Sequence, residues 1–306
     1  MNDTLPQPCA LDLAGGVAVI TGAASGIGLA LARKARSRGM RLVLADIDAQ
    51  ALQRARQALE VADADVLLQA TDVSRDAEVQ RLADAAFARF GSVHLLCNNA
   101  GVGFARLAAE HSAADWEWVI GVNLYGVAHG IRHFLPRMQA AGHAAHVLNT
   151  ASAAGLVSLP GMAAYNASKQ AVVALSETLR AELLAARSPV GVSVLCPAWV
   201  PTAIDASERA RPPRYGQATA ASAGSAVYAQ VLQQAVRAGR LDADAIAGIA
   251  FDAVARRQFY ILPHPKIAKA LAQRAAEIVD STAAATSVPA SPASPASPAS
   301  PSSPAP

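Results

Sequence analysis

Residues 16–28, which read GVAVITGAASGIG, decide the fold of this chain. The stretch opens with an apolar run that has the length of a buried strand, and a helical pattern follows it to about residue 38. The glycines between them permit a tight turn and let a ligand approach the backbone closely. A helix that begins at such a turn presents free N–H groups and the positive end of its dipole, so the stretch predicts a phosphate-binding turn. Its candidate binding residues are Gly22, Ser25, Gly26, Ile27 and Gly28.

The glycine spacing of this turn is Gly-x-x-x-Gly-x-Gly rather than the better-known Gly-x-Gly-x-x-Gly. Taken alone, the motif also fits a glycine-rich turn that binds nothing. The sequence that follows has to distinguish the two interpretations.

Apolar runs and helical patterns alternate along the rest of the chain. This alternation predicts right-handed βαβ units and a parallel sheet that is covered on both faces. We therefore expect an α/β fold with a Rossmann-type doubly wound parallel sheet of about seven strands. Its further strands are expected at residues 41–45, 65–69, 93–97, 145–149, 190–195 and 258–262, and its helices at about 49–61, 76–90, 114–140, 162–186, 242–256 and 267–279.

Composition divides the chain into one expected domain, residues 1–280, and a tail. Within the domain, residues 203–240 are irregular and mix polar with apolar residues, which predicts a lid or insertion over the site. From residue 281 large apolar residues are almost absent and Ser-Pro-Ala recurs. Such a segment cannot offset its ordering entropy, so we expect residues 281–306 to be disordered.

Bulk properties exclude several classes of partner. Hydrophobic residues make up 53% of the chain, and a net charge of +3 without a long block of like charge argues against nucleic acid or an anionic membrane. No apolar run of about 18 residues predicts a spanning helix, and residues 1–10 do not resemble a secretory signal. The three cysteines, Cys9, Cys97 and Cys196, predict free thiols in a reducing cytoplasm.

Acidic residues follow the second and third expected strands. Asp46 ends the second strand about 20 residues after the turn, where a carboxylate accepts bonds from ribose hydroxyls and repels a 2′-phosphate. This favours NAD over NADP as cofactor, although Asp46 could instead cap the next helix, a role also open to Asp48. Asp72, followed by Val73, is placed to meet the adenine edge.

A tyrosine and a lysine lie four residues apart at the start of the expected helix 162–186. Tyr165 and Lys169 therefore share one helical face, where a lysine favours the phenolate and lowers the tyrosine pKa. Ser152 follows the fifth expected strand, at the sheet edge where α/β ligand sites form. Its hydroxyl could donate to a carbonyl oxygen, or it could satisfy local backbone only.

The assembled pattern resembles the classical short-chain dehydrogenase/reductase family. The resemblance covers residues 14–200 strongly and extends to about residue 263 by architecture. It implies the strand order 3-2-1-4-5-6-7. It is carried, in the family's order and approximate spacing, by residues 21–28, Asp72, the NNAG run at 98–101, Asn123, Ser152, Tyr165, Lys169 and residues 197–202.

The resemblance assigns catalytic roles to four residues. Tyr165 would be the general acid/base, and Lys169 would lower its pKa and bind the nicotinamide ribose. Ser152 would polarise the substrate oxygen, and Asn123 would hold a water of a proton relay to Lys169. Tyr165 and Lys169 also count among the cofactor-binding residues, which further include Asn99, Ala100, Gly101, Pro197, Val200 and Thr202.

The resemblance thus implies an NAD(H)-dependent oxidoreductase that interconverts a secondary alcohol and a ketone. Two alternatives stay open: an NADP(H)-dependent ketone reductase, and a catalytically silent cofactor-binding regulator on the same fold. No metal is expected, because His129 and His133 have a metal-compatible spacing on one helix but no evident third ligand. Members of this family commonly form dimers or tetramers, so the resemblance implies a homodimer or homotetramer formed through the helices at about 114–140 and 162–186.

One position departs from the family pattern. Ala198 follows Pro197 where the family usually has glycine, and it would be strained if the site requires a positive φ. Large apolar residues near the site predict an apolar substrate, or else simply contacts within the loop core. The candidate pocket residues are Phe104, Leu156, Val157, Met162 and Trp199. The arginines of the lid, Arg209, Arg211 and Arg214, fit a solvated loop better than a grip on an acidic substrate.

Overall fold

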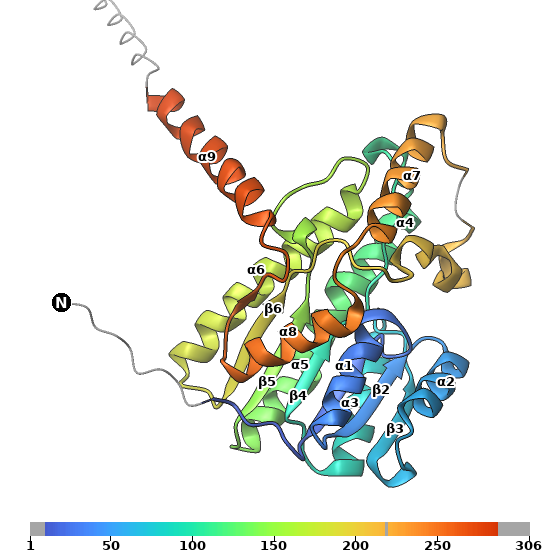
Figure 1. The fold of residues 1–306 in the computed structure, drawn as a ribbon, viewed down its shortest axis with the longest axis vertical. Coiled ribbons are helices and arrows are strands. Elements are labelled where there is room, and N and C mark those ends of the chain that lie inside the picture. The colour runs from blue at the N-terminus through green and yellow to red at the C-terminus, as the bar shows by residue number, and fades with distance from the viewer. Residues whose placement is uncertain (1–9, 218–219, 287–306) are drawn as a thin grey trace, which may run out of the picture. The chain divides into compact units, whose positions relative to one another are not determined.

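The computed structural model describes residues 10–217 and 220–286 (Figure 1). The chain separates into two compact units, one ending at Ile267 and one beginning at Ala268. The second unit consists, within the described residues, of the helix α9 (Ile267–Thr286). The first unit holds every other element described below.

The first unit is built on a seven-stranded sheet in which each neighbouring pair of strands is parallel. The strand order β3-β2-β1-β4-β5-β6-β7 confirms the expected doubly wound fold. From β1 the chain adds strands first on one side, β2 and β3, and then on the other, β4 to β7. This switch opens a crevice at the carboxyl ends of β1 and β4, which is where ligands bind in such sheets. The strands are β1 (Val17–Thr21), β2 (Arg41–Asp46), β3 (Val66–Ala70), β4 (Leu95–Asn98), β5 (Ala145–Thr150), β6 (Val190–Leu195) and β7 (Tyr260–Ile261).

Helices cover both faces of the sheet (Figure 1). On one face α1 packs against α8 and α2, and on the other α3 packs against α5 while α4 packs against α6. The strands between these layers are largely apolar, and the whole of β1 is buried. The helices are α1 (Gly26–Ser37), α2 (Ala49–Leu59), α3 (Asp76–Phe90), α4 (Ala113–Ile120), α5 (Gly126–Ala140), α6 (Ala163–Ala185), α7 (Ala223–Arg237) and α8 (Ala243–Ala255).

The structure corrects the expectation that residues 203–240, called here the lid segment, are irregular. The lid segment contains two short 3-10 turns, Ile204–Ala210 and Pro213–Tyr215, and the 15-residue helix α7. Glycine and serine at the start of α7 obscured its helical pattern. Its apolar residues Leu232 and Val236 are buried against Met162 rather than against the sheet. The helix therefore depends on a tertiary contact that its own sequence does not announce.

Residues 114–140 do not form one continuous helix. A π-helical segment, Gly121–Tyr125, separates α4 from α5. Such segments are rare and occur frequently at functional sites. Residues 281–286, which the composition assigned to a disordered tail, continue α9, and residues 287–306 of that expected tail lie outside the described residues. Within the described parts of the chain, no helix combines the length and apolar character needed to cross a membrane.

Candidate active site

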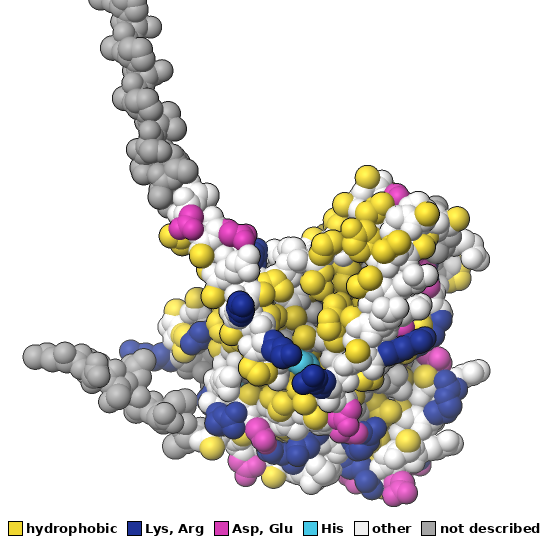
Figure 2. All heavy atoms as spheres, turned by 45° about the horizontal axis from the view of Figure 1, so that its top comes forward, with side chains coloured by type: hydrophobic (Ala, Val, Ile, Leu, Met, Phe, Trp, Pro, Cys, Tyr) yellow, Lys and Arg dark blue, Asp and Glu magenta, His cyan; other side chains and the backbone are white. Residues whose placement is uncertain are grey.

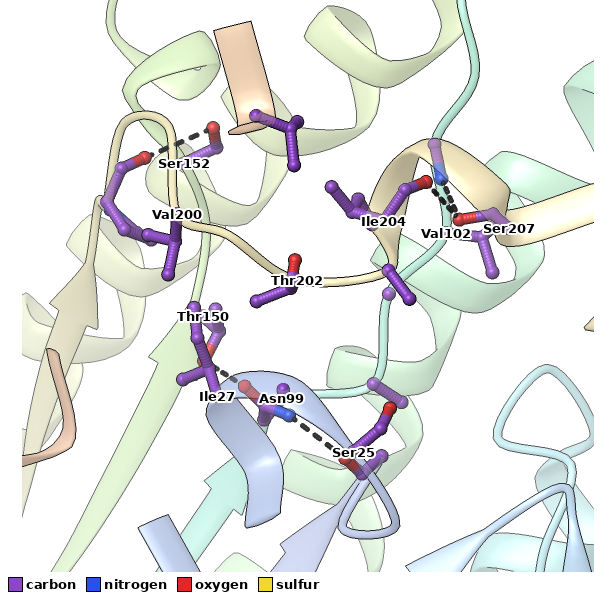
Figure 3. A pocket seen from close by; sticks show the side chains of 18 of the residues that line it. Ser25, Ile27, Asn99, Val102, Thr150, Ser152, Val200, Thr202, Ile204 and Ser207 are labelled. Atoms are coloured by element: carbon purple, nitrogen blue, oxygen red, sulfur yellow. Dashed lines mark hydrogen bonds between the residues drawn. The ribbon is translucent and has the colours of Figure 1, made fainter. Parts of the chain in front are cut away.

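A cavity of about 1450 Å³ lies at the carboxyl ends of the strands. Its walls come from the turn after β1, the ends of β2 to β6 and the lid segment. It brings together most of the residues that the sequence singled out, although they are spread over more than half the chain. Figure 3 shows side chains from the turn, from the end of β5 and from the lid segment pointing toward a shared space.

The turn between β1 and α1 forms one end of the cavity. Gly22 and Gly26 have φ values of +63° and +51°, a conformation that other L-residues rarely adopt. At Gly28 a Cβ atom would lie 2.0 Å from the carbonyl oxygen of Gly22, so the turn closes only because this residue lacks a side chain. The turn therefore requires all three glycines, and Ser25 and Ile27 line the cavity beside them.

The end of β4 fastens this turn from the side. The hydroxyl of Thr21 accepts hydrogen bonds from the backbone N–H groups of Asn99, at 2.9 Å, and Ala100, at 3.1 Å. The side-chain amide of Asn99 donates to the carbonyl oxygen of Thr21 at 3.1 Å. Asn99, Ala100 and Gly101 all line the cavity. The NNAG run thus acts as a brace for the turn as well as a wall of the site.

Asp46 lies at the cavity wall and does not cap a helix. Its carboxylate accepts from the N–H groups of Ala24, at 3.1 Å, and Asp48, at 3.2 Å. Burial raises the pKa of Asp46, and these backbone hydrogen bonds oppose the shift. The cap of α2 is Asp48, whose side chain accepts from the N–H of Ala51. The alternative role for Asp46 as a helix cap is therefore wrong.

Asp72 has a partner that the sequence did not reveal. One carboxylate oxygen accepts from the hydroxyl of Ser74 at 2.6 Å, and the other accepts from the guanidinium of Arg214 at 2.5 Å. Arg214 belongs to the lid segment, which the sequence assigned to solvent. The adjacent Val73 is buried, lines the cavity and accepts a hydrogen bond from His129.

Tyr165 and Lys169 share one face of α6, as their spacing predicted, but the expected pKa shift is absent. Lys169 is almost fully buried, its Nζ donates to the carbonyl oxygen of Thr150 at 2.9 Å, and it lies 5.8 Å from the centre of the Tyr165 ring. Burial lowers the pKa of Lys169 to about 8. Burial also raises the pKa of Tyr165, and the hydroxyl of Ser152 only partly opposes this shift. The expected lowering of the tyrosine pKa is therefore wrong for the protein alone, because desolvation dominates.

Ser152 serves its local backbone and faces the cavity as well. Its hydroxyl accepts from the N–H of Ala154 at 3.1 Å and donates to the carbonyl oxygen of Pro197 at 3.4 Å (Figure 3). It also interacts with the phenol of Tyr165. The two interpretations of this serine are thus compatible.

Asn123 lies in the π-helical segment and is fully buried. Its side-chain oxygen accepts from the N–H of Val102 at 2.8 Å, and its amide donates to the carbonyl oxygen of Val102 at 2.9 Å and to Ser168 at 3.0 Å. The side chain of Asn123 is therefore held by hydrogen bonds to its own protein, and its expected role in holding a water of a proton relay stays a prediction. Its evident structural effect is to hold the loop that follows β4.

The loop after β6 closes over the phosphate-binding turn. Thr202 lies so close to Gly26 that a Cβ atom there would be 3.2 Å from its methyl group. Pro197 and Val200 line the cavity as well. Ala198 is not in the positive-φ region, so the departure from glycine introduces no strain. Its N–H donates to Nδ1 of His264 at 3.1 Å, a contact from a residue that sequence reasoning did not identify.

The other end of the cavity is apolar. Met162 is buried with Leu232 and Val236 of α7, and Trp199 and Tyr165 pack against this cluster. Met162, Trp199 and Val157 line the cavity. Figure 2 shows hydrophobic side chains gathered around a hollowed face of the molecule.

Two candidate pocket residues lie elsewhere. Phe104 packs in a separate cluster and stacks on Trp118, with ring centres 5.9 Å apart. Neither Phe104 nor Leu156 belongs to the lining of the cavity. Both side chains are buried, so an apolar residue of these loops can belong to the core without lining the cavity.

The two histidines of α5 have structural partners. His133 lies 2.8 Å from a carboxylate oxygen of Asp76, and His129 bonds the carbonyl oxygen of Val73 at 2.9 Å. In the part of the chain that the structure describes, no group of three or more His, Cys, Asp and Glu side chains is arranged to hold a metal ion.

The residues at the glycine-rich end fit a dinucleotide. The turn there is a cradle of backbone groups that forms only because Gly28 has no side chain, and the N-terminus of α1 opens onto the cavity. Together with the sheet topology, this cradle defines a nucleotide-binding protein of the Rossmann type.

Comparison with known proteins identifies the family. A family model described as short chain dehydrogenase matches residues 16–213. The chain therefore belongs to the short-chain dehydrogenase family, and it is an NAD(P)-dependent oxidoreductase that acts on CH–OH groups.

Three relatives illustrate the match. A CLA biosynthesis dehydrogenase/reductase of Lactiplantibacillus plantarum is 36% identical over 86% of this chain and 93% of its own length. A 1-deoxy-11-beta-hydroxypentalenate dehydrogenase of Streptomyces avermitilis is 42% identical over 60% of this chain and 68% of its own. A crystal structure of a short-chain dehydrogenase/reductase from Burkholderia phymatum in complex with NAD is 49% identical, with a TM-score of 0.86, and covers 93% of this chain and 99% of that one.

Proposed function

We propose that this protein is an NAD(H)-dependent oxidoreductase that interconverts a secondary alcohol and a ketone on a bulky apolar skeleton. The observation that carries the proposal is one continuous cavity. At one end it has the glycine cradle, at the other the apolar cluster around Met162 and Trp199, and Tyr165 and Ser152 line it between them.

Tyr165 is the proposed proton-transfer residue. In oxidation the phenolate oxygen accepts the proton of the substrate hydroxyl while the carbon–hydrogen bond breaks, and in reduction the phenol returns that proton. NAD, when bound, supplies the hydride chemistry. Ser152 orients the substrate oxygen beside the phenol, and the charge of Lys169 favours the phenolate once the substrate has displaced water. Because the pKa of Tyr165 is raised in the protein alone, we infer that the bound cofactor contributes to activating the phenol.

Asp46 supports NAD rather than NADP. A carboxylate at the end of β2 accepts bonds from ribose hydroxyls and repels a 2′-phosphate. The complex of the Burkholderia phymatum relative with NAD agrees with this preference. The adjacent Asp48 adds a second negative charge on the same wall of the cavity.

The apolar cluster supports a hydrophobic substrate. Met162, Leu232 and Val236 are buried, and Trp199 and Ile204 pack against them, so a polar skeleton would lose its hydration without gaining partners there. The names of two relatives point to hydroxypentalenate and to CLA biosynthesis, and both belong to those proteins alone. The substrate class that we propose for this chain rests on the pocket.

The remaining expectations belong to the proposal as well. We propose a homodimer or homotetramer formed through residues 114–140 and 162–186, a cytoplasmic location, and a single domain that extends to about residue 280. In the structure the first two ranges correspond to α4, α5 and α6.

The proposed function is tested with a panel of secondary alcohols and ketones that runs from small and polar to bulky and apolar. The absorbance of reduced nicotinamide is followed with NAD(H) and with NADP(H). We expect turnover to rise with apolar bulk and to be faster with NAD(H). Cofactor binding without turnover on any member of the panel would instead support the catalytically silent regulator.

A further inference from the structure

The ring of Tyr165 rests on the backbone of Gly103. A Cβ atom at Gly103 would lie 2.8 Å from Cδ2 of the ring and 3.1 Å from Cε2. This edge of the ring therefore packs closely on the backbone of residue 103, and a shift of that backbone toward the ring pushes on the phenol.

The loop that carries Gly103 is held from two sides. Asn123 bonds both backbone groups of Val102. From the other side, the hydroxyl of Ser207 accepts from the N–H of Gly103 at 3.0 Å and donates to the carbonyl oxygen of Ile204 at 2.7 Å. Figure 3 shows the hydroxyl of Ser207 directed toward Ile204 and the segment of Val102. One of these anchors belongs to the framework and the other to the lid segment.

We propose that Ser207 is a positioning residue, which aligns the phenol of Tyr165 by holding Gly103 when the lid segment is in place. The inference rests on the proposed role of Tyr165 as the proton-transfer residue. It makes the lid segment a determinant of proton transfer in addition to a wall of the pocket.

Burial makes this hydrogen bond hard to replace. Ser207 is only 6% exposed and the bond itself is buried, so water cannot readily take the place of the hydroxyl. The loop must then either leave an N–H unsatisfied or move toward another acceptor. Since the ring lies directly against Gly103, such a movement misplaces the phenol.

Another lid serine provides a matched control. Ser222 caps α7 and donates to Glu110 at 2.7 Å. It lies outside the turn Ile204–Ala210, which carries Ser207. Replacing it by alanine weakens a contact between the lid segment and Glu110, further along the same β4–α4 connection, and leaves the hydrogen bonds of Val102 and Gly103 in place. The two serines therefore separate alignment of the phenol from general loosening of the lid segment.

The kinetic test compares Ser207→Ala and Ser222→Ala, with Gly103→Ala as a second variant that presses on the ring directly. For Ser207→Ala and Gly103→Ala we expect kcat to fall by about 10- to 100-fold, with KM and the Kd for NADH near their wild-type values. Ser207→Thr keeps the hydroxyl and should recover much of kcat. Three results would overturn the inference: wild-type kcat in Ser207→Ala, a rise in KM alone, or an equal loss of kcat in Ser222→Ala.

A measurement without substrate separates this inference from the proposed function. The chain has five tyrosines, so 13C-labelled tyrosine gives a simple NMR spectrum in which Tyr165→Phe assigns the relevant signal. We expect that signal to shift in Ser207→Ala and Gly103→Ala and to stay in place in Ser222→Ala. An unchanged signal in Ser207→Ala would reject the positioning role even if the enzyme turns over, whereas a shifted signal without turnover would reject the proposed function alone.

Discussion

Arg214 donates a hydrogen bond to the carboxylate of Asp72 at 2.5 Å, although the two residues are 142 positions apart in the chain. The bond joins the lid segment to the loop after β3, at the end of the cavity where the adenine is expected. The Asp72 side chain is 9% exposed and that of Arg214 is 33% exposed, so the pair is partly shielded from water. It competes with any ligand group that approaches this carboxylate oxygen.

Removing this ion pair should loosen the lid segment. We expect Arg214→Met to speed hydrogen exchange in residues 203–240, because the pair contributes about 1 kcal/mol to holding that segment in place. The comparison is Arg209→Met, since Arg209 is an exposed arginine of the same segment and has no carboxylate within salt-bridge distance among the described residues. Equal exchange rates in wild type and Arg214→Met would contradict the anchoring role.

Replacing Asp46 should change the preference between cofactors. In Asp46→Ser the carboxylate that repels a 2′-phosphate is gone, so we expect the ratio of the Kd for NADPH to that for NADH to fall by about 10- to 100-fold. Fluorescence titration with both cofactors measures this ratio. Asp48→Ser is the control, because serine still caps α2 while the neighbouring charge is lost. If the ratio of the two Kd values changes only in Asp48→Ser, the cofactor preference depends on Asp48 and the prediction for Asp46 is wrong.

Replacing Tyr165 by phenylalanine should nearly abolish turnover. The ring and its packing against Gly103 are kept, but no group remains that can accept or donate the substrate proton. We expect kcat to fall by about 100- to 10,000-fold while NADH binds as in the wild type. Kinetics on the best substrate of the panel and a NADH titration check this. Turnover within a few-fold of wild type would remove the assignment of the phenol as the acid/base.

Asp115 should be a stability determinant outside the reaction itself. Its buried carboxylate accepts from Arg211 at 2.7 Å, lies 3.6 Å from Arg106 and forms a capping box with Ser112. Asp115→Ala leaves two buried guanidinium groups without this counter-charge, so we expect the free energy of unfolding to fall by about 3–5 kcal/mol. Urea unfolding measures the loss. Ser112→Ala removes the cap alone and should cost about 1 kcal/mol, and an equal loss in both variants would leave no role for the ion pairs.

His146 should make the protein sensitive to acid. Burial, aided by the charge of Arg257, lowers the pKa of this histidine from 6.5 to about 3. Between these two pH values the unfolded chain binds more protons than the folded one, so stability is full above pH 6.5 and is lost as the pH falls toward 3. The contribution of His146 to the slope of the free energy of unfolding against pH approaches about 1.4 kcal/mol per pH unit.

The measurement is urea unfolding at several pH values between 4 and 7, about the range over which the unfolded histidine titrates. His146→Gln removes the titrating group, so the slope of the free energy of unfolding against pH should become shallower by about that amount. His143→Gln is the control, because it replaces a half-buried histidine three positions along the chain and leaves the buried His146 in place. An identical slope in His146→Gln and wild type would contradict the prediction.

Local patterns were sufficient for the sheet and much of the site. Apolar runs marked all seven strands, with every end placed to within two residues, because a strand buried between two helical layers is predominantly apolar. The carboxyl ends of parallel strands meet at one edge, so the residues that follow them converge there. This is why the positions of Asp46 and Ser152 after their strands predict one shared site, whereas the family resemblance alone indicated Asn99.

The sequence by itself determined the individual strands of the doubly wound sheet, the glycine-rich turn and the face of α6 that carries Tyr165 and Lys169, because each depends on residues close together in the chain. Tertiary structure alone decided the helix α7, the clasp of Arg214 on Asp72 and the support of Gly103 by Ser207. It also decided the direction of the Tyr165 pKa, since desolvation depends on every element that encloses the phenol. These features join segments that are distant in sequence, and no periodicity or spacing within either segment records its partner.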